Sequence, residues 1–275
     1  MPPRPEPLRH APYADGPPDF AIGLKPIAPE AWLEGGEADP AARKDPLFET
    51  ARPLVWGETD GSRPGQLEVL ELVAASTPVP PRPDLPPLYA AARAVADDLC
   101  LMEKRGDAWT LTAVSLSAGS FFTAAEALGR RLDQLHAPVP GFEDRLGPRV
   151  TRMFDNLPEA AILERRNWTV VNSGALHAPD VAAIRAEIPT IPPEAAADRL
   201  RLRIERQTLR RLPRTGGVLF TIRIWTHPLA LLRDHPGHLA AFARAWRAAP
   251  EAFRAYKQLA LYDALVEAFL RAEGE

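Results

Sequence analysis

The sequence contains a single cysteine, Cys100, in 275 residues. One cysteine excludes a disulfide within the chain and suits a reducing compartment. Its neighbours Leu99, Leu101 and Met102 are apolar, which favours a space-filling role for the thiol. Long apolar runs are missing as well, since none approaches membrane-spanning length and the first residues lack the apolar stretch of a signal peptide. We therefore expect a cytoplasmic protein that makes no membrane contact.

A surplus of positive charge is also absent. The net charge of -3 argues against a nucleic-acid-binding protein, for which a basic surplus is expected. Basic residues do gather between Arg199 and Arg214, but no pattern of stacking aromatics accompanies them. The chain has no Gly-rich phosphate loop, no Gly-x-Ser-x-Gly motif and no histidine pair at the helical spacing of a zinc site.

Proline, in contrast, is abundant, with 31 residues. It is dense in residues 2–29, where we expect an extended arm that docks on the protein through Phe20 and Trp32. A second group, Pro78–Pro87, predicts a loop between two helices. With no internal repeat and no flexible linker, the sequence favours a Pro-rich arm over residues 1–20 and a single domain over residues 21–275.

Hydrophobic periodicity predicts an α+β fold in which antiparallel strands are flanked by helices. Ser120 is the expected N-cap of the helix Phe121–Leu135. The expected hairpin turns are Arg105-Gly106-Asp107 and Pro213–Gly217. The expected strands are Asp98–Lys104, Trp109–Leu116, Leu163–Val171, Leu200–Leu209 and Val218–Trp225. The expected helices are Leu88–Asp97, Phe121–Leu135, Phe142–Asn156, Leu239–Ala248 and Glu251–Ala272.

One histidine stands at a distinctive place, at the end of an expected helix. His136 is followed at once by Ala137-Pro138-Val139-Pro140-Gly141. Prolines fix φ and remove backbone donors, so the chain leaves the helix stiffly and the imidazole has little freedom to move. Such a histidine can serve as a metal or haem ligand, or as a helix-terminal cation that satisfies the last carbonyls.

Two arginines lie where an expected hairpin should be buried. Alternation places Arg206 and Thr208 on the face of Leu202 and Ile204, and places Arg223 and Thr221 on the matching face of the return strand. Buried arginines need anionic partners because an unpaired buried charge is costly. The carboxylates of a haem, a flavin phosphate or an acidic substrate would serve. A structural ion pair, for instance with Glu164, would serve equally.

Several strings in a fixed order resemble the haem-dependent oxidative N-demethylase alpha-subunit-like family. They are Ile22–Pro26, Trp32-Leu33, Asp98–Met102, Trp109–Ala113, Leu135–Phe142, Arg166–Trp168, Arg203–Pro213 and Val218–Arg223. The resemblance covers the chain from about Phe20 to the last helices. The chain departs from the family pattern at Ala127, where a lysine is expected, and over residues 117–121, which replace a Cys-Phe-Pro-Ser-like segment.

The resemblance implies a PAS-like haem domain that acts as a monooxygenase. Such an enzyme uses O2, and electrons from a separate flavin and iron–sulfur reductase, to demethylate a secondary amine such as dimethylamine and release formaldehyde. It implies haem b as the cofactor and His136 as the ligand of its iron. Pro138, which holds the ligand still, and Arg206, Thr208 and Arg223 are then candidate cofactor-binding residues, the arginines as propionate or substrate-side contacts.

A second class of function remains open, that of a non-catalytic PAS-like protein that binds haem or a small ligand as a sensor. The other histidines are weaker ligand candidates. His177 lies in a Leu-His-Ala-Pro segment like that of His136, but no helix leads into it. His235 and His238 flank Pro236-Gly237 and are typical of capping and turn positions.

Overall fold

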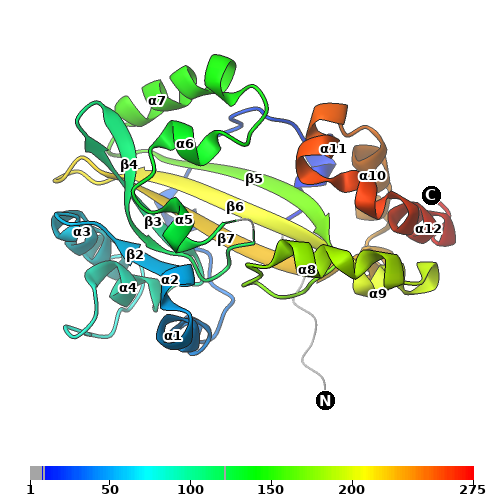
Figure 1. The fold of residues 1–275 in the computed structure, drawn as a ribbon, viewed down its shortest axis with the longest axis horizontal. Coiled ribbons are helices and arrows are strands. Elements are labelled where there is room, and N and C mark those ends of the chain that lie inside the picture. Colours follow the sequence, from blue (N-terminus) through cyan, green and yellow to red (C-terminus); the bar gives the residue numbers. More distant parts are fainter. Residues whose placement is uncertain (1–7, 9, 121) are drawn as a thin grey trace. The chain divides into compact units, whose positions relative to one another are not determined.

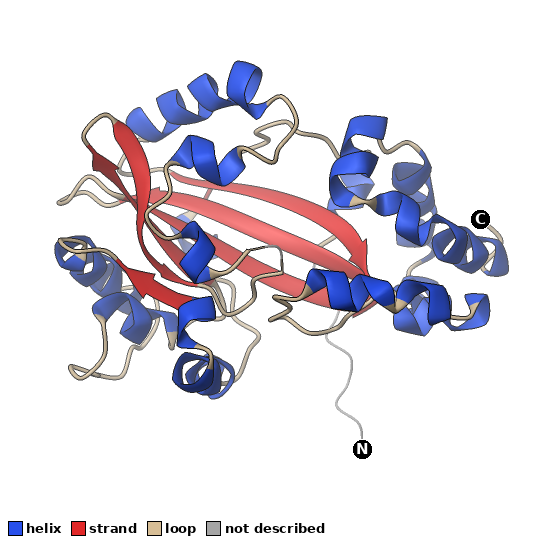
Figure 2. Ribbon diagram, in the orientation of Figure 1, coloured by secondary structure: helices blue, strands red, loops and turns tan. Residues whose placement is uncertain are grey.

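The computed structural model describes residues 8, 10–120 and 122–275, and its strands form one seven-stranded sheet (Figures 1 and 2). The strand order is β1-β5-β6-β7-β3-β4-β2. The strands are β1 (Lys25–Ile27), β2 (Trp56–Glu58), β3 (Asp98–Arg105), β4 (Ala108–Ser115), β5 (Ile162–Val171), β6 (Arg201–Arg211) and β7 (Val218–Pro228). The sheet is antiparallel with helices beside it, so the α+β prediction is confirmed. All five expected strands are present, within a few residues of their expected ends.

The helices connect and flank these strands. They are α1 (Pro40–Thr50), α2 (Arg52–Val55), α3 (Arg63–Ala74), α4 (Pro87–Ala92), α5 (Ala124–Ala127), α6 (Leu132–His136), α7 (Gly147–Asp155), α8 (Val181–Ala186), α9 (Ala196–Arg199), α10 (Pro236–Arg247), α11 (Glu251–Lys257) and α12 (Asp263–Ala272). The Pro78–Pro87 segment joins α3 to α4, as predicted. Among the described residues, no helix is long and apolar enough to cross a bilayer.

Three of the expected helices differ from the structure. The expected helix Leu88–Asp97 ends at Ala92, the last residue of α4, and two others are interrupted. The expected helix Phe121–Leu135 starts outside the described residues and is divided into α5 and α6. Gly129 separates them with a φ of 75°, a left-handed conformation that an α-helix excludes. The expected helix Glu251–Ala272 is divided into α11 and α12 by Gln258, with a φ of 54°. Neither break contains a proline, and the apolar periodicity continues across both, so this periodicity does not mark where the helices end.

The cap of α5 also differs from the predicted one. Thr123, not Ser120, stands before the first helical residue. The backbone N–H of Glu126 donates to Thr123 Oγ1 at 3.3 Å, and the backbone N–H of Thr123 donates to Glu126 Oε2 at 2.8 Å. This reciprocal pair satisfies two of the unbonded groups at the helix start.

The chain divides into two compact units. The first comprises Met1–Ala21, Arg166–Glu205 and Ile224–Glu275, and the second comprises Ile22–Arg165 and Arg206–Arg223. In the described part of the first unit, α10 and α12 pack through Phe242, Val266 and Leu270 around buried Trp168. The N-terminal segment docks there through Phe20, whose ring contacts the rings of Phe253 and Tyr256 at centroid distances of 5.5 and 5.7 Å.

In the second unit, residues on both faces of the sheet are buried. One face, which we call the core face, carries Leu99, Leu219 and Thr221 and packs against apolar residues of α3 and α4. Thr208 bonds Thr221 across β6 and β7, so Thr208 lies on the same face. The alternate residues Gln207 and Phe220 therefore point to the opposite face, which we call the Cys100 face after the residue paired with Phe220. Gln207 and Phe220 are partly exposed, whereas Cys100 is buried.

Candidate functional site

His136 is the last residue of α6, and the turns on both sides of this short helix are fixed by hydrogen bonds. At its start, the backbone N–H of Arg131 donates to Gln134 Oε1 at 2.9 Å. After its end, the backbone N–H of Val139 donates to the carbonyl of His136 at 2.8 Å. Gly141 then turns the chain with a φ of 68°. The chain thus leaves α6 through a hydrogen-bonded turn that contains Pro138 and Pro140, and the stiffness of this exit stays a prediction.

The imidazole of His136 is held in one orientation. Its Nδ1 lies 2.8 Å from the carbonyl oxygen of Leu132, which can only accept, so Nδ1 carries the proton. The ring stacks on Phe142 with centroids 4.6 Å apart and an interplanar angle of 11°. The carbonyl belongs to the first turn of α6. Helix geometry explains this contact, because residues four positions apart, such as Leu132 and His136, lie one above the other on the same side of a helix.

The protonation state of His136 suits a ligand. Burial lowers the pKa of the imidazole, and the charge of Arg165 lowers it further, against the opposing effect of the Leu132 carbonyl. The ring is therefore neutral at pH 7, with its proton on Nδ1 and a lone pair on Nε2. A neutral imidazole whose second nitrogen is bound to a carbonyl is the usual form of a histidine that ligates iron. The residues present at this position fit a haem ligand.

Arg165 follows Glu164 on β5. Glu164 contacts Arg206, and Arg206 shares the core face with Thr208 because the two are two residues apart. Arg165 therefore points to the Cys100 face, and its charge contributes to the lowered pKa of His136.

Arg206 is fully buried and makes protein contacts through each of its three nitrogens. Nε donates to Glu164 and lies 3.1 Å from Glu34 Oε1, and Nη1 donates to the carbonyl of Trp32 at 2.7 Å. Nη2 donates to the carbonyl of Ala31. These contacts match the structural ion pair that the sequence left open. A contact of Arg206 with a haem propionate stays a prediction.

Thr208 and Arg223 contact the same segment as Arg206. Trp32 Nε1 donates to Thr208 Oγ1 at 3.2 Å, and the Thr208 and Thr221 hydroxyls lie 2.7 Å apart. Arg223 Nη1 donates to Glu37 Oε2 at 3.3 Å. Residues 31–37, which we call the strap, are thus bound to the core face by β6 and β7. The cofactor contacts predicted for Thr208 and Arg223 also stay predictions.

Next to these cations lie two successive acids that sequence analysis did not single out. Asp97 and Asp98 are each 1% exposed. Asp98 accepts from Ser117 N–H at 2.7 Å, from Ser117 Oγ at 2.6 Å and from Ala118 N–H at 2.8 Å. Asp97 accepts no hydrogen bond from any described residue. Burial raises the pKa of Asp97 to about 6, although Arg223, Arg206 and Lys44 pull it down.

Asp97→Asn is expected to stabilise the protein at high pH. A raised pKa means that the folded state prefers the protonated acid, so stability is lost as pH rises from 3.8 through about 6. Asparagine removes that ionisation, and at pH 8 the gain amounts to up to about 3 kcal/mol, at about 1.36 kcal/mol per pH unit. Urea denaturation at pH 5 and pH 8 measures it. Asp98→Asn, equally buried but fully bonded, is the matched control and should destabilise. An equal effect of Asp97→Asn at both pH values would contradict the argument.

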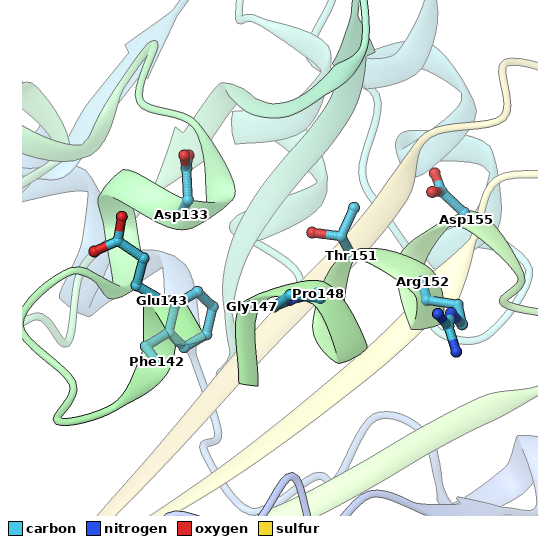
Figure 3. Close-up of a pocket in the computed structure, with 8 residues that line it drawn as sticks. All are labelled: Asp133, Phe142, Glu143, Gly147, Pro148, Thr151, Arg152 and Asp155. Atoms are coloured by element: carbon cyan, nitrogen blue, oxygen red, sulfur yellow. The ribbon is translucent and has the colours of Figure 1, made fainter. Parts of the chain in front are cut away.

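One surface cavity of about 440 Å³ lies close to the histidine (Figure 3). Phe142, which stacks on His136, also lines this cavity, whereas His136 does not. The other lining residues are Asp133, Glu143, Gly147, Pro148, Thr151, Arg152 and Asp155. Within the described ranges, no three His, Cys, Asp or Glu side chains are arranged to hold a metal ion. A haem iron requires only one or two axial ligands from the protein.

The remaining histidines lie in the first unit. His235 and His238 flank the start of α10, with ring centroids 5.8 Å apart, as expected for turn and cap positions. His177 lies in an irregular segment before α8, so its Leu-His-Ala-Pro string has no helix behind it. Comparison with protein families gives a match over residues 48–266, which contain α6, β5 and the hairpin. The matching family is described as haem-dependent oxidative N-demethylase, alpha subunit-like.

Proposed function

The chain belongs to the haem-dependent oxidative N-demethylase, alpha subunit-like family, and on this premise we propose that it is the catalytic haem subunit of an amine monooxygenase. The proposed substrate is a secondary methylamine such as dimethylamine. The methyl carbon leaves as formaldehyde and the amine leaves one methyl group shorter. Dioxygen is the oxidant, and a separate flavin and iron–sulfur reductase supplies the electrons.

The observation that carries the proposal is the state of His136. Its Nδ1–H is bound to the Leu132 carbonyl, its ring is stacked on Phe142, and burial keeps it neutral. Nε2 would hold the iron of a haem b, and Pro138 would belong to the turn that fixes His136. When bound, haem supplies the oxygen-activating chemistry that no side chain provides.

The protein residues have their own tasks in this proposal. The hydrogen bond to Leu132 fixes the tautomer of His136, so that Nε2 is always the atom available for coordination. The stacked Phe142 restricts rotation of the ring and excludes water from one of its faces. Arg165 disfavours the imidazolium form, which could not ligate. Burial and the charge of Arg165 outweigh the opposing effect of the Leu132 carbonyl on the pKa, so a coordinating nitrogen stays available down to a lower pH than for a free histidine.

We also propose a PAS-like domain over residues 21–275 with a Pro-rich arm over residues 1–20, acting in the cytoplasm. The seven-stranded antiparallel sheet with helices beside it supports a PAS-like domain. The alternative function, a haem-binding sensor, shares the same site. It differs only in what happens after the cofactor binds.

Two measurements on the purified chain test the proposal. After reconstitution with haemin, we expect a Soret band and a 1:1 titration end point. With a chemical or enzymatic reductant and O2, we expect formaldehyde release from dimethylamine that depends on haem. A protein without a Soret band would refute the haem assignment. A haem-loaded protein that releases no formaldehyde from methylated secondary amines would favour the sensor.

A further inference from the structure

A buried acid beside the start of α1 takes part in no hydrogen bond with the described residues. Asp97 is 1% exposed, and neither oxygen of its carboxyl group has such a partner. The next residue, Asp98, is equally buried but accepts three hydrogen bonds. A carboxylate that is buried without donors is costly, because it loses its hydration and gains no hydrogen bond in exchange. The surroundings of Asp97 therefore suit its protonated form.

Polar residues at the start of α1 cover this acid. Lys44 Nζ donates to the backbone carbonyl of Asp97 at 2.6 Å, and Arg43 Nη2 donates to the carbonyl of Ala96 at 3.1 Å. Arg43 also contacts the strap, with 2.7 Å between its Nε and Glu37 Oε1. These contacts join the start of α1 to the backbone around Asp97 and leave the carboxyl group itself unbonded.

This cover is the side from which water can reach Asp97 at the lowest cost. On the other side Asp97 continues into β3, whose residues Asp98–Met102 are all buried. The side chains of Arg43 and Glu37, in contrast, are 19% and 20% exposed. The two residues before Glu37 are exposed glycines, and the second of them, Gly36, has a φ of 121°. Glycine leaves the backbone free to change conformation there. We call residues 35–44 the flap.

We propose that Asp97 is a pH-sensitive switch that opens and closes the flap. While the carboxyl group is protonated, the flap stays closed over it. When the group ionises, the flap moves away from β3 and admits water, which solvates the carboxylate. Burial raises the pKa of Asp97 to about 6, against the charges of Arg223, Arg206 and Lys44. Opening therefore increases as the pH rises toward neutrality, and the switch works independently of the haem site.

Other charged groups surround Asp97. Burial lowers the pKa of Lys44 to about 8. Burial raises the pKa of Glu37, but the hydrogen bond and charge of Arg43 outweigh it and lower that pKa. Measurements at pH 5 and pH 7 therefore avoid the titration of both groups, and guanidinium groups stay protonated throughout. The charged neighbours are Arg43 and Lys44 on α1, Glu37 on the strap, Asp98 on β3, Arg206 on β6 and Arg223 on β7.

Amide hydrogen exchange at pH 5 and pH 7, corrected for the intrinsic rate at each pH, tests the switch. An acid with a raised pKa stabilises the closed form below its ordinary value of 3.8, and this stability is lost as the pH rises through about 6. Opening measured on peptides of the flap and α1 should therefore increase about 10-fold from pH 5 to pH 7. Because the opening is local, it should depend little on dilute urea, whereas exchange in β6 should depend on it steeply.

Two variants separate pH sensing from a general weakening of the fold. Asp97→Asn keeps the shape of the side chain without its ionisation, so its flap should open equally at both pH values. Asp45→Asn is the matched control, because Asp45 lies on α1 and its hydrogen bond with Arg93 lowers its pKa. It should speed exchange at both pH values and keep the 10-fold ratio. A wild-type ratio near one, an unchanged ratio in Asp97→Asn, or flap exchange as sensitive to urea as that of β6 would overturn the switch.

Discussion

His136→Ala is expected to abolish tight haem binding. On the proposed assignment, alanine removes the nitrogen that would ligate the haem iron, while the short helix keeps its backbone, because alanine is the best helix former. We expect the haemin affinity to fall by about 100-fold or more, which is roughly 2.7 kcal/mol. Titration of the Soret band measures the loss, and far-UV circular dichroism shows whether the fold is retained.

A matched control exists in the same chain. His177 lies in Leu176-His177-Ala178-Pro179, the same four residue types as Leu135-His136-Ala137-Pro138. Its segment is irregular, and no helix precedes it. His177→Ala is therefore expected to keep wild-type haem affinity. If His177→Ala lost haem while His136→Ala kept it, the assignment of the ligand would be wrong.

Arg206→Met is expected to destabilise the fold by about 3–5 kcal/mol, the usual cost of breaking a buried ion pair from one side. Methionine fills a similar volume but leaves the Glu164 carboxylate without its guanidinium. It also leaves the carbonyls of Trp32 and Ala31 without the donors that hold the strap. Urea denaturation at pH 7 measures the difference in the free energy of unfolding.

The double variant Arg206→Met, Glu164→Gln separates the charge from the packing. Removing both charges should recover part of the loss, because a neutral amide is less costly to bury than an unpaired carboxylate. Arg214→Met is the surface control. Arg214 is 61% exposed and contacts Glu71, so its loss should cost about 1 kcal/mol or less. A cost for Arg206→Met no greater than for Arg214→Met would contradict a structural role for the buried pair.

The strands could be predicted from the sequence because their pattern is local. Alternating apolar residues around Gly106 and Gly216 fix two hairpins, and both glycines have positive φ in the structure. The helix breaks could not be predicted in the same way. Gly129 turns away from the helix because its N–H donates to the carbonyl of Leu111 at 2.9 Å, a contact 18 positions away in the sequence.

The candidate site was predictable only in part, for the same reason. His136 carried a local signal, a helix end followed by two prolines, and the structure places it as expected. The alternation of residues in the hairpin predicts that Arg206 and Arg223 are buried, but it does not predict which acids they contact. Glu164, Glu34 and Glu37 supply the opposing charges from distant positions in the chain. Asp97 precedes β3 and accepts no hydrogen bond from a described residue, whereas Asp98 accepts from Ser117 and Ala118, a difference set by contacts distant in the sequence.

The contact between Leu111 and the segment before α6 has a mechanical consequence. Leu111 also donates its N–H to the carbonyl of Arg130 at 3.0 Å, and Thr110 forms a bridge with Arg131. The segment at the start of α6 is thereby hydrogen-bonded to β4, beside the sheet. His136 is one turn from that attachment and the proline turn follows it. The position of the imidazole is therefore coupled to β4 through backbone hydrogen bonds.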